Sequence, residues 1–150
     1  MTTAADVHRD IRVANEQADV RKCWPAFKQL RPHLTSEDEF VNRWHKQAAE
    51  GYKIVYVVEG SSVPAAAGYR VLHTMAWGRI LYIDDLVALE ASHRKGLGTA
   101  LLQHLQDEAR KLGCLAVHLD TGYQRHRAHR AYLRNGFVLD CHHMSWRPGS

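Results

Sequence analysis

Several features are scarce or missing in this sequence, and each absence excludes a class of protein. No apolar run approaches the roughly eighteen residues that a membrane span needs, and the first residues contain no apolar core of a signal peptide. The 3 cysteines show no CxxC spacing, which fits a reducing compartment better than a disulfide framework. We therefore expect a cytoplasmic protein that is neither inserted in a membrane nor exported, and whose thiols are structural.

A concentration of charge is missing as well. The formal net charge is only +4, and the basic residues are spread along the chain. This balance is compatible with an anionic ligand, whereas nucleic acid would favour a concentrated basic patch with interleaved aromatic residues. The densest basic stretch, residues 125–134, is either a solvated helix face or part of a phosphate or substrate site. We expect no nucleic-acid partner.

The histidines lack the arrangement of a metal site. There are 11 of them, including His126 and His129 at helical spacing and the adjacent pair His142 and His143. No cysteine or carboxylate accompanies them at the spacing that metal sites use. We predict no metal site.

The chain does contain enough apolar residues for one core. Of its 150 residues 45% are hydrophobic, and the length favours a single domain over residues 1–150. Alternation predicts a short strand at 10–14, and helical spacing predicts one bent helix or two short ones at 16–31, because of Pro25. Ser36 and Glu39 have the spacing of a capping box, so a further helix should begin there and end near Gly51.

The second half alternates strands and helices. Strands are predicted at 54–58, 65–75 and 80–89, and tight turns should join them into an antiparallel meander. A helix at 97–112 then leads to a buried strand at 115–119, parallel to the strand before the helix. A helix at 125–135 and a closing strand at 137–146 complete a mixed α/β fold. We expect one twisted mixed sheet of about six or seven strands, flanked by about four helices.

A glycine-containing loop, His93–Gly98, joins the last strand of the meander to the next helix. Glycines permit close approach, and the unpaired amides at a helix N-terminus attract phosphate. A Rossmann dinucleotide site is disfavoured, because about six residues separate the strand from Gly96 and Leu101 stands where a small residue is needed. Asp120, at the end of the next predicted strand, keeps that alternative open. A P-loop is excluded because no Gly-Lys-Ser/Thr follows.

Two motifs together resemble the acetyl-coenzyme A binding half of the GNAT superfamily of N-acetyltransferases. The family's Gln/Arg-x-x-Gly-x-Gly/Ala corresponds to His93-Arg94-Lys95-Gly96-Leu97-Gly98, with histidine in the first position. The family's Ala-x-x-x-Tyr-x-x-x-Gly-Phe matches at Ala128, Tyr132, Gly136 and Phe137. The resemblance covers about residues 80–146. Within it, the string from Gln124 to Arg134, followed by His143, is loosely similar to a small-substrate branch that includes the aminoalkylphosphonate acetyltransferases.

The resemblance implies a GNAT-like fold and an acetyl-CoA-dependent N-acetyltransferase. Such an enzyme transfers an acetyl group to a primary amine of a small molecule or peptide by direct attack in a ternary complex. Tyr132 would be the general acid for the departing thiolate. Acetyl-CoA would bind through strand residues, loop residues and two residues of the later helix, namely Leu86, Val87, Ala88, His93, Arg94, Lys95, Gly96, Leu97, Gly98, Thr99, Arg125 and Tyr132. Arg125 stands where the family often has asparagine.

The acceptor side rests on individual residues. Asp84 and Asp85 are adjacent carboxylates in an apolar strand, and alternation would send them to opposite faces, so that one reaches the substrate as amine anchor or general base. Glu90 is a weaker candidate for the same role. His129 and His143 are candidates for the wall of the substrate pocket. A non-catalytic CoA-binding sensor is the alternative function, and a homodimer is compatible with the sequence.

Overall fold

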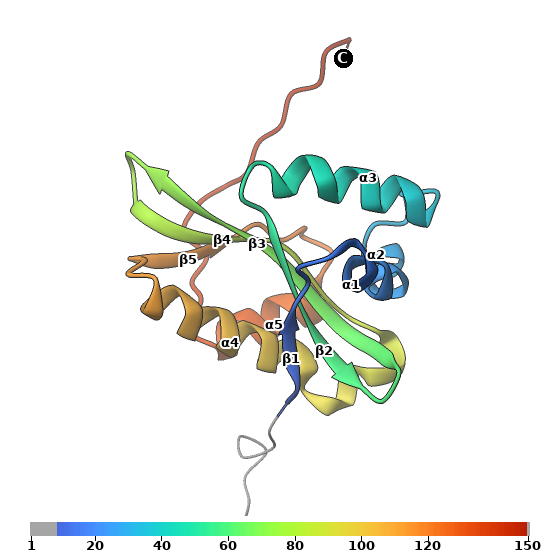
Figure 1. Ribbon diagram of the computed structural model, residues 1–150. Helices are drawn as coiled ribbons and strands as arrows, with labels where there is room; N and C mark the ends of the chain where they lie inside the picture. Colours follow the sequence, from blue (N-terminus) through green and yellow to red (C-terminus); the bar gives the residue numbers. More distant parts are fainter. Residues whose placement is uncertain (1–8, 150) are drawn as a thin grey trace, which may run out of the picture. The chain divides into compact units, whose positions relative to one another are not determined.

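The computed structural model describes residues 9–149, apart from the side chains of His93, Arg94 and Lys95. The chain forms two compact units, Met1–Leu119 and Asp120–Ser150, and each is described by itself. Figure 1 shows their strands and helices. Among the described residues no helix is both long enough and apolar enough to cross a membrane.

The first unit contains one sheet of five strands in the order β1-β2-β3-β4-β5. The strands are β1 (Ile11–Val13), β2 (Lys53–Glu59), β3 (Ser62–Thr74), β4 (Gly78–Ala88) and β5 (Ala116–Leu119). The helices of this unit are α1 (Gln17–Lys22), α2 (Trp24–Leu30), α3 (Glu37–Ala48) and α4 (Leu97–Lys111), with a 3-10 helix η2 (Glu90–Lys95) before α4.

The pairing of the strands confirms the predicted meander. Strands β1 to β4 are antiparallel, and β5 runs parallel to β4 after the crossover through α4. The β4–β5 ladder ends at the pair Ile83 and Leu119, although β4 continues to Ala88. Between β3 and β4 the register shifts next to Gly68, so that Asp84 is an extra residue on β4. This β-bulge positions the candidate site.

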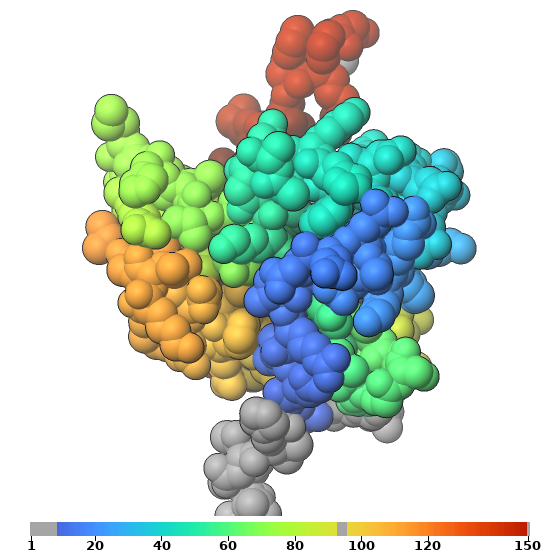
Figure 2. Space-filling model, in the orientation of Figure 1, coloured from blue at the N-terminus to red at the C-terminus, as the bar shows by residue number. Residues whose placement is uncertain are grey.

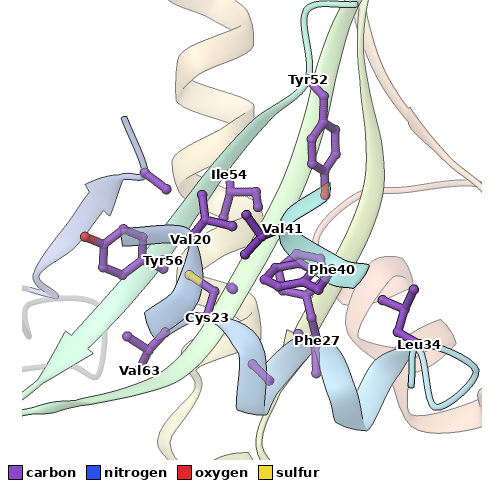
Figure 3. Close-up of a cluster of buried hydrophobic side chains, with 14 residues drawn as sticks. Val20, Cys23, Phe27, Leu34, Phe40, Val41, Tyr52, Ile54, Tyr56 and Val63 are labelled. Atoms are coloured by element: carbon purple, nitrogen blue, oxygen red, sulfur yellow. The ribbon is translucent and has the colours of Figure 1, made fainter. Parts of the chain in front are cut away.

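Helices cover both faces of the sheet in the first unit (Figure 1). Figure 2 shows α1, α2 and α3, coloured blue to cyan, packed together over one face. Their apolar side chains and those of the sheet form the cluster in Figure 3, in which Phe27 and Phe40 lie with ring centroids 4.8 Å apart. On the other face α4 buries the stripe that its sequence predicts, Leu97, Leu101, Leu102, Leu105 and Ala109.

Local sequence explains how the helical layer begins and ends. Pro25 lies in the first turn of α2, so the region is two short helices. Ser36 Oγ accepts a hydrogen bond from Glu39 N at 3.1 Å, which confirms the predicted cap of α3. The Glu39 carboxylate accepts from Thr35 N and Thr35 Oγ1, and these bonds lower the pKa of Glu39. Cys23 is buried between α1 and α2, and burial raises the pKa of its thiol to about 12. That thiol is therefore structural.

The second unit contains α5 (His126–Arg134) and an extended C-terminal segment. The helix confirms its prediction, but the closing strand predicted at 137–146 is wrong, since the described residues of that segment form no strand. A β-strand is stable only when it pairs with another strand. A sequence pattern can indicate a pleated segment, but it does not show that a partner strand is available. Asp140, His142 and His143 also interrupt the apolar pattern, and Val138 and Trp146 are exposed. The sheet accordingly has five strands, not six or seven, with five α-helices among the described residues.

Candidate active site

The bulge on β4 brings two carboxylates to one face of the sheet. Asp85 lies opposite Gly68, whereas Ile83 lies opposite Tyr69, so Asp84 is the additional residue between them. Both aspartates line the same cavity beneath α2 and α3. The prediction from alternation that they face opposite sides is therefore wrong, because one extra residue reverses the alternation at that point.

Asp85 is held by side chains from two other elements. Tyr52, which precedes β2, donates its hydroxyl hydrogen to Asp85 Oδ2 at 2.5 Å. Arg31, which ends α2, donates from Nε to Asp85 Oδ1 at 3.0 Å and from Nη2 to the Asp84 carbonyl at 2.9 Å. Burial raises the pKa of Tyr52 well above its usual value, and the neighbouring Asp85 raises it further, so the hydroxyl remains a donor. The carboxylate keeps lone pairs on both oxygens for a substrate amine.

Tyr52 can reach Asp85 because Gly68 has no side chain. A Cβ on this glycine would lie 1.7 Å from the Tyr52 hydroxyl oxygen and 2.3 Å from ring atom Cζ. The tyrosine therefore passes directly over the backbone of β3. Figure 3 shows the Tyr52 ring extending toward the buried apolar cluster. Glycine at this position is required by close approach of a side chain.

Asp84 has a separate cation. Arg70 Nε and Nη2 donate to its two carboxylate oxygens at 2.8 Å each, a bidentate pair. The Arg70 guanidinium also lies over the Tyr82 ring, 5.4 Å from its centroid. Asp84 is thus fixed by neighbours on β3 and β4, and Asp85 is tied to the helical layer.

The cavity beside these aspartates has a volume of about 340 Å³. That volume is at the lower end of the range for small-molecule sites, roughly 300–1,000 Å³. Its wall combines α2, α3, the connection between them and the β4 bulge, and is formed by Phe27, Arg31, His33, Leu34, Phe40, Arg43, Trp44, Gln47, Tyr52, Asp84 and Asp85. All of these residues belong to the first unit.

Strand β4 continues from the aspartates into the predicted cofactor segment, Leu86, Val87 and Ala88. Because Leu89 N donates to Pro64 O on β3, alternation directs the amide of Leu86 away from β3, toward the side where the β5 ladder has ended. Gln29 of α2 holds the end of this segment. Its Nε2 donates to Ala88 O at 3.1 Å, and its Oε1 accepts from Glu90 N at 3.2 Å.

The glycine loop meets α4 in a conformation suited to an anion. Gly96 has a φ of 69°, in the left-handed region, and no described side chain caps the helix. The first described α-helical bond of α4 runs from Ala100 N to Gly96 O, so the amides of Leu97, Gly98 and Thr99 have no partner within the helix. These amides and the helix dipole fit a pyrophosphate.

Gly98 provides a separate indication of whether a phosphate-bearing ligand fits at the start of α4. Its φ is not in the left-handed region, and among the described residues a Cβ on it would meet no atom within 4 Å. Glycine in a helix costs up to about 1 kcal/mol relative to alanine. Neither backbone nor packing requires glycine at this position, whereas close approach of a phosphate-bearing ligand would. The side chains of His93, Arg94 and Lys95, also predicted to bind the cofactor, lie outside the described residues.

The remaining predicted site residues belong to the second unit. Tyr132 of α5 is buried, and its ring centroid lies 5.8 Å from that of Phe137, so the spaced motif joins two contacting aromatic side chains. Arg125 precedes α5. His129 Nε2 lies 2.8 Å from Gly122 O, and His143 Nδ1 lies 3.2 Å from Asp120 Oδ1. Both contacts lie within this unit.

Sequence reasoning missed four residues that shape the site: Tyr52, Arg31, Gly68 and Gln29. Gly68 carried a signal, since an isolated glycine within a predicted strand often marks a bulge or a close approach. The other three act over long sequence separations, and no local pattern indicates their partners. The fold also contradicts the Rossmann alternative, because the glycine loop follows the fourth strand of a mainly antiparallel sheet.

Comparison with known proteins matches this sequence to one family and its fold to solved structures. The sequence profile of the Acetyltransferase (GNAT) family matches residues 17–137, which include parts of both units. The uncharacterized N-acetyltransferase YhdJ of Bacillus subtilis (strain 168) is 31% identical over 118 residues, covering 78% of this chain and 83% of that protein.

Two further similarities are narrower in what they show. The aminoalkylphosphonate N-acetyltransferase of Salmonella typhimurium (strain LT2) is 38% identical over 66 residues, covering 44% of this chain and 42% of that protein. The solved structure of aminoglycoside N-acetyltransferase AAC(6')-Iy in complex with CoA has a TM-score of 0.82 at 16% identity, covering 95% of this chain and 96% of that chain. At that identity the likeness shows the fold.

Proposed function

Since the chain belongs to the GNAT family of acetyltransferases, we propose that it acetylates a primary amine of a small molecule or peptide by direct attack in a ternary complex. The observation that carries the proposal is the continuity of β4. The strand lines the cavity with Asp85 and then runs directly into Leu86, Val87 and Ala88, beyond the β5 ladder. An acceptor in the cavity is therefore adjacent to the segment that would hold the acyl donor.

Acetyl-CoA is the acyl donor of this N-acetyltransferase family, and its thioester supplies the activated acetyl group. We infer that the amides of Leu97, Gly98 and Thr99 hold its pyrophosphate, with Gly96 shaping the loop and Arg94 and Lys95 adding charge. His93 and Arg125 are further proposed cofactor contacts. Leu86, Val87 and Ala88 would bind the pantetheine arm through their backbone. The Leu86 amide is the donor best directed to polarise the thioester carbonyl.

On the acceptor side, we propose that Asp85 binds the substrate amine. Its carboxylate lines the cavity, and its contacts with Arg31 and Tyr52 fix its orientation. It can orient the amine or accept its proton directly or through water. Asp84 supports the position of Asp85, because it is the extra residue that forms the β4 bulge. We retain His129 and His143 as proposed substrate contacts from the second unit.

Tyr132 completes the proposed chemistry as the general acid for the departing thiolate. This role requires the two units to act as one acetyltransferase domain, which the family match across residues 17–137 supports. A cytoplasmic location is also part of the proposal, supported by three free cysteines. A homodimer remains compatible with it.

Replacing Tyr132 by phenylalanine tests this function. We expect kcat to fall about 10- to 1000-fold in a thiol-release assay, because the thiolate loses its proton donor. Calorimetry should give an almost unchanged Kd for acetyl-CoA. Tyr123→Phe is the matched control, since Tyr123 lies in the same unit and is 81% exposed, and it should leave kcat unchanged. An unchanged kcat in Tyr132→Phe would reassign that tyrosine to packing. Acetyl-CoA binding without thiol release for any amine would favour a CoA-binding sensor.

A further inference from the structure

The charged side chains at the two ends of the cavity differ in how far neighbouring residues neutralise them. At the β4 end, each carboxylate already has an arginine: Arg70 binds Asp84 through two hydrogen bonds, and Arg31 binds Asp85. These side chains are also poorly exposed, at 19% for Asp84 and 12% for Asp85. This end of the cavity is therefore close to neutral and can accept an amine through lone pairs, without needing a full positive charge on the ligand.

The α3 wall has a cation that is less engaged. Phe40, Arg43, Trp44 and Gln47 occur at helical spacing and all face the cavity. Arg43 makes one described ion pair, a long contact of 3.5 Å from Nη2 to Glu39 Oε1, and its side chain is 55% exposed. The other oxygen of Glu39 already accepts two hydrogen bonds from Thr35, at 2.9 and 2.8 Å. A guanidinium has five N–H donors, so Arg43 retains capacity for a ligand.

Apolar side chains line the cavity together with these polar groups. Phe27, Leu34, Phe40 and Trp44 contribute hydrocarbon surface, while His33 and Gln47 add polar groups. A ligand that satisfies this wall has an amine for Asp85, a short hydrocarbon body and an anionic group for the guanidinium. Arginine matches carboxylate and phosphonate oxygens through paired N–H donors.

From this arrangement we propose that the acceptor is a small amine that also carries an oxyanion, and that Arg43 binds the oxyanion while Asp85 orients the amine. The inference rests on the proposed acetyl transfer and names its substrate class. The cavity volume of about 340 Å³ suits a molecule of amino-acid size. Arg43 is thus a specificity-determining residue. Amines of the same size that carry no anionic group are poor acceptors.

Matched acceptors provide the test. Amines with two to four carbons between nitrogen and a terminal carboxylate or phosphonate are compared with their uncharged amide or alcohol counterparts. We expect kcat/KM to favour the anionic member of a pair at least 10-fold, mainly through KM. Arg43→Gln should bring that ratio close to one, and Arg43→Lys should keep part of the preference. Lys46→Gln is the control, because it removes the same charge from an exposed position of α3 outside the cavity.

A binding measurement separates this inference from the catalytic one. With CoA present in place of acetyl-CoA, calorimetry reports acceptor affinity without turnover, and the anionic member of each pair should bind at least 10-fold more tightly to the native chain but not to Arg43→Gln. Equal affinity for both members, or an unchanged preference in Arg43→Gln, overturns the inference and leaves acetyl transfer standing. Preferential binding of the anions without any thiol release would overturn the transferase proposal and keep the oxyanion site.

Discussion

At the scale of single residues, the site depends on a glycine and a tyrosine that no motif identifies. Gly68 leaves room for Tyr52 to cross β3, and Tyr52 in turn holds Asp85 at the bulge. The hydroxyl hydrogen bond is charge-assisted, which makes it shorter and stronger than one between neutral groups. A single Cβ is therefore enough to separate the candidate amine anchor from Tyr52 and to leave Arg31 as its remaining described side-chain partner.

We predict that Gly68→Ala destabilises the protein by about 1–3 kcal/mol, the usual cost of overpacking, and lowers kcat/KM. The new Cβ would overlap the Tyr52 hydroxyl and ring, so the tyrosine must leave Asp85. Chemical denaturation of Gly68→Ala, Tyr52→Ala and the double variant measures the coupling between the two positions. The cost of the alanine at position 68 should largely disappear when the ring is absent. An equal cost in both backgrounds would show that the contact is not its cause.

At the scale of elements, the second residue of α4 is a glycine, which lowers the stability of the helix. Gly98 lies within the helix, yet no described neighbour and no backbone angle requires glycine there. We predict that Gly98→Ala raises the free energy of unfolding of the ligand-free protein by up to about 1 kcal/mol. The same change should weaken acetyl-CoA binding, because the methyl group enters the space proposed for the pyrophosphate. Denaturation and calorimetry on the two proteins measure both effects. Higher stability with unchanged affinity would place the cofactor elsewhere.

Helices and strands were also the features that the sequence predicted best. The apolar stripe of α4, the Ser36 cap and the tight turns that join β2, β3 and β4 each reflect contacts within a few residues, and all three predictions are confirmed. The bulge at Asp84 is different, because it depends on how β3 and β4 are registered across the sheet. The same limit explains the strand wrongly predicted at 137–146, since periodicity cannot identify a pairing partner. The phosphate loop at Gly96 was predicted from local chemistry and the role of Tyr132 from family resemblance, whereas the partners of Asp85 required the fold.

At the scale of the whole molecule, the division into two units raises the question of cooperativity. The second unit, Asp120–Ser150, is shorter than the ~40 residues below which chains rarely fold without disulfides, metals or partners. Its described helix α5 buries Tyr132, and Cys141 in this unit is a free thiol. A segment of this size with one helix has too little apolar surface to offset its conformational entropy alone.

We therefore predict that the second unit does not unfold independently. In native-state hydrogen exchange with increasing denaturant, the slowest amides of α5 should merge with those of α4 at the global free energy of unfolding. Adding CoA at about 100 times its Kd should raise both values by about 2.7 kcal/mol, because a ligand that binds only the folded chain stabilises every part that unfolds with it. If α5 instead exchanges at a lower free energy and CoA leaves it unchanged, residues 1–150 do not act as a single domain. The proposed role of Tyr132 would then lose its structural basis, since a general acid must be held where the thiolate departs.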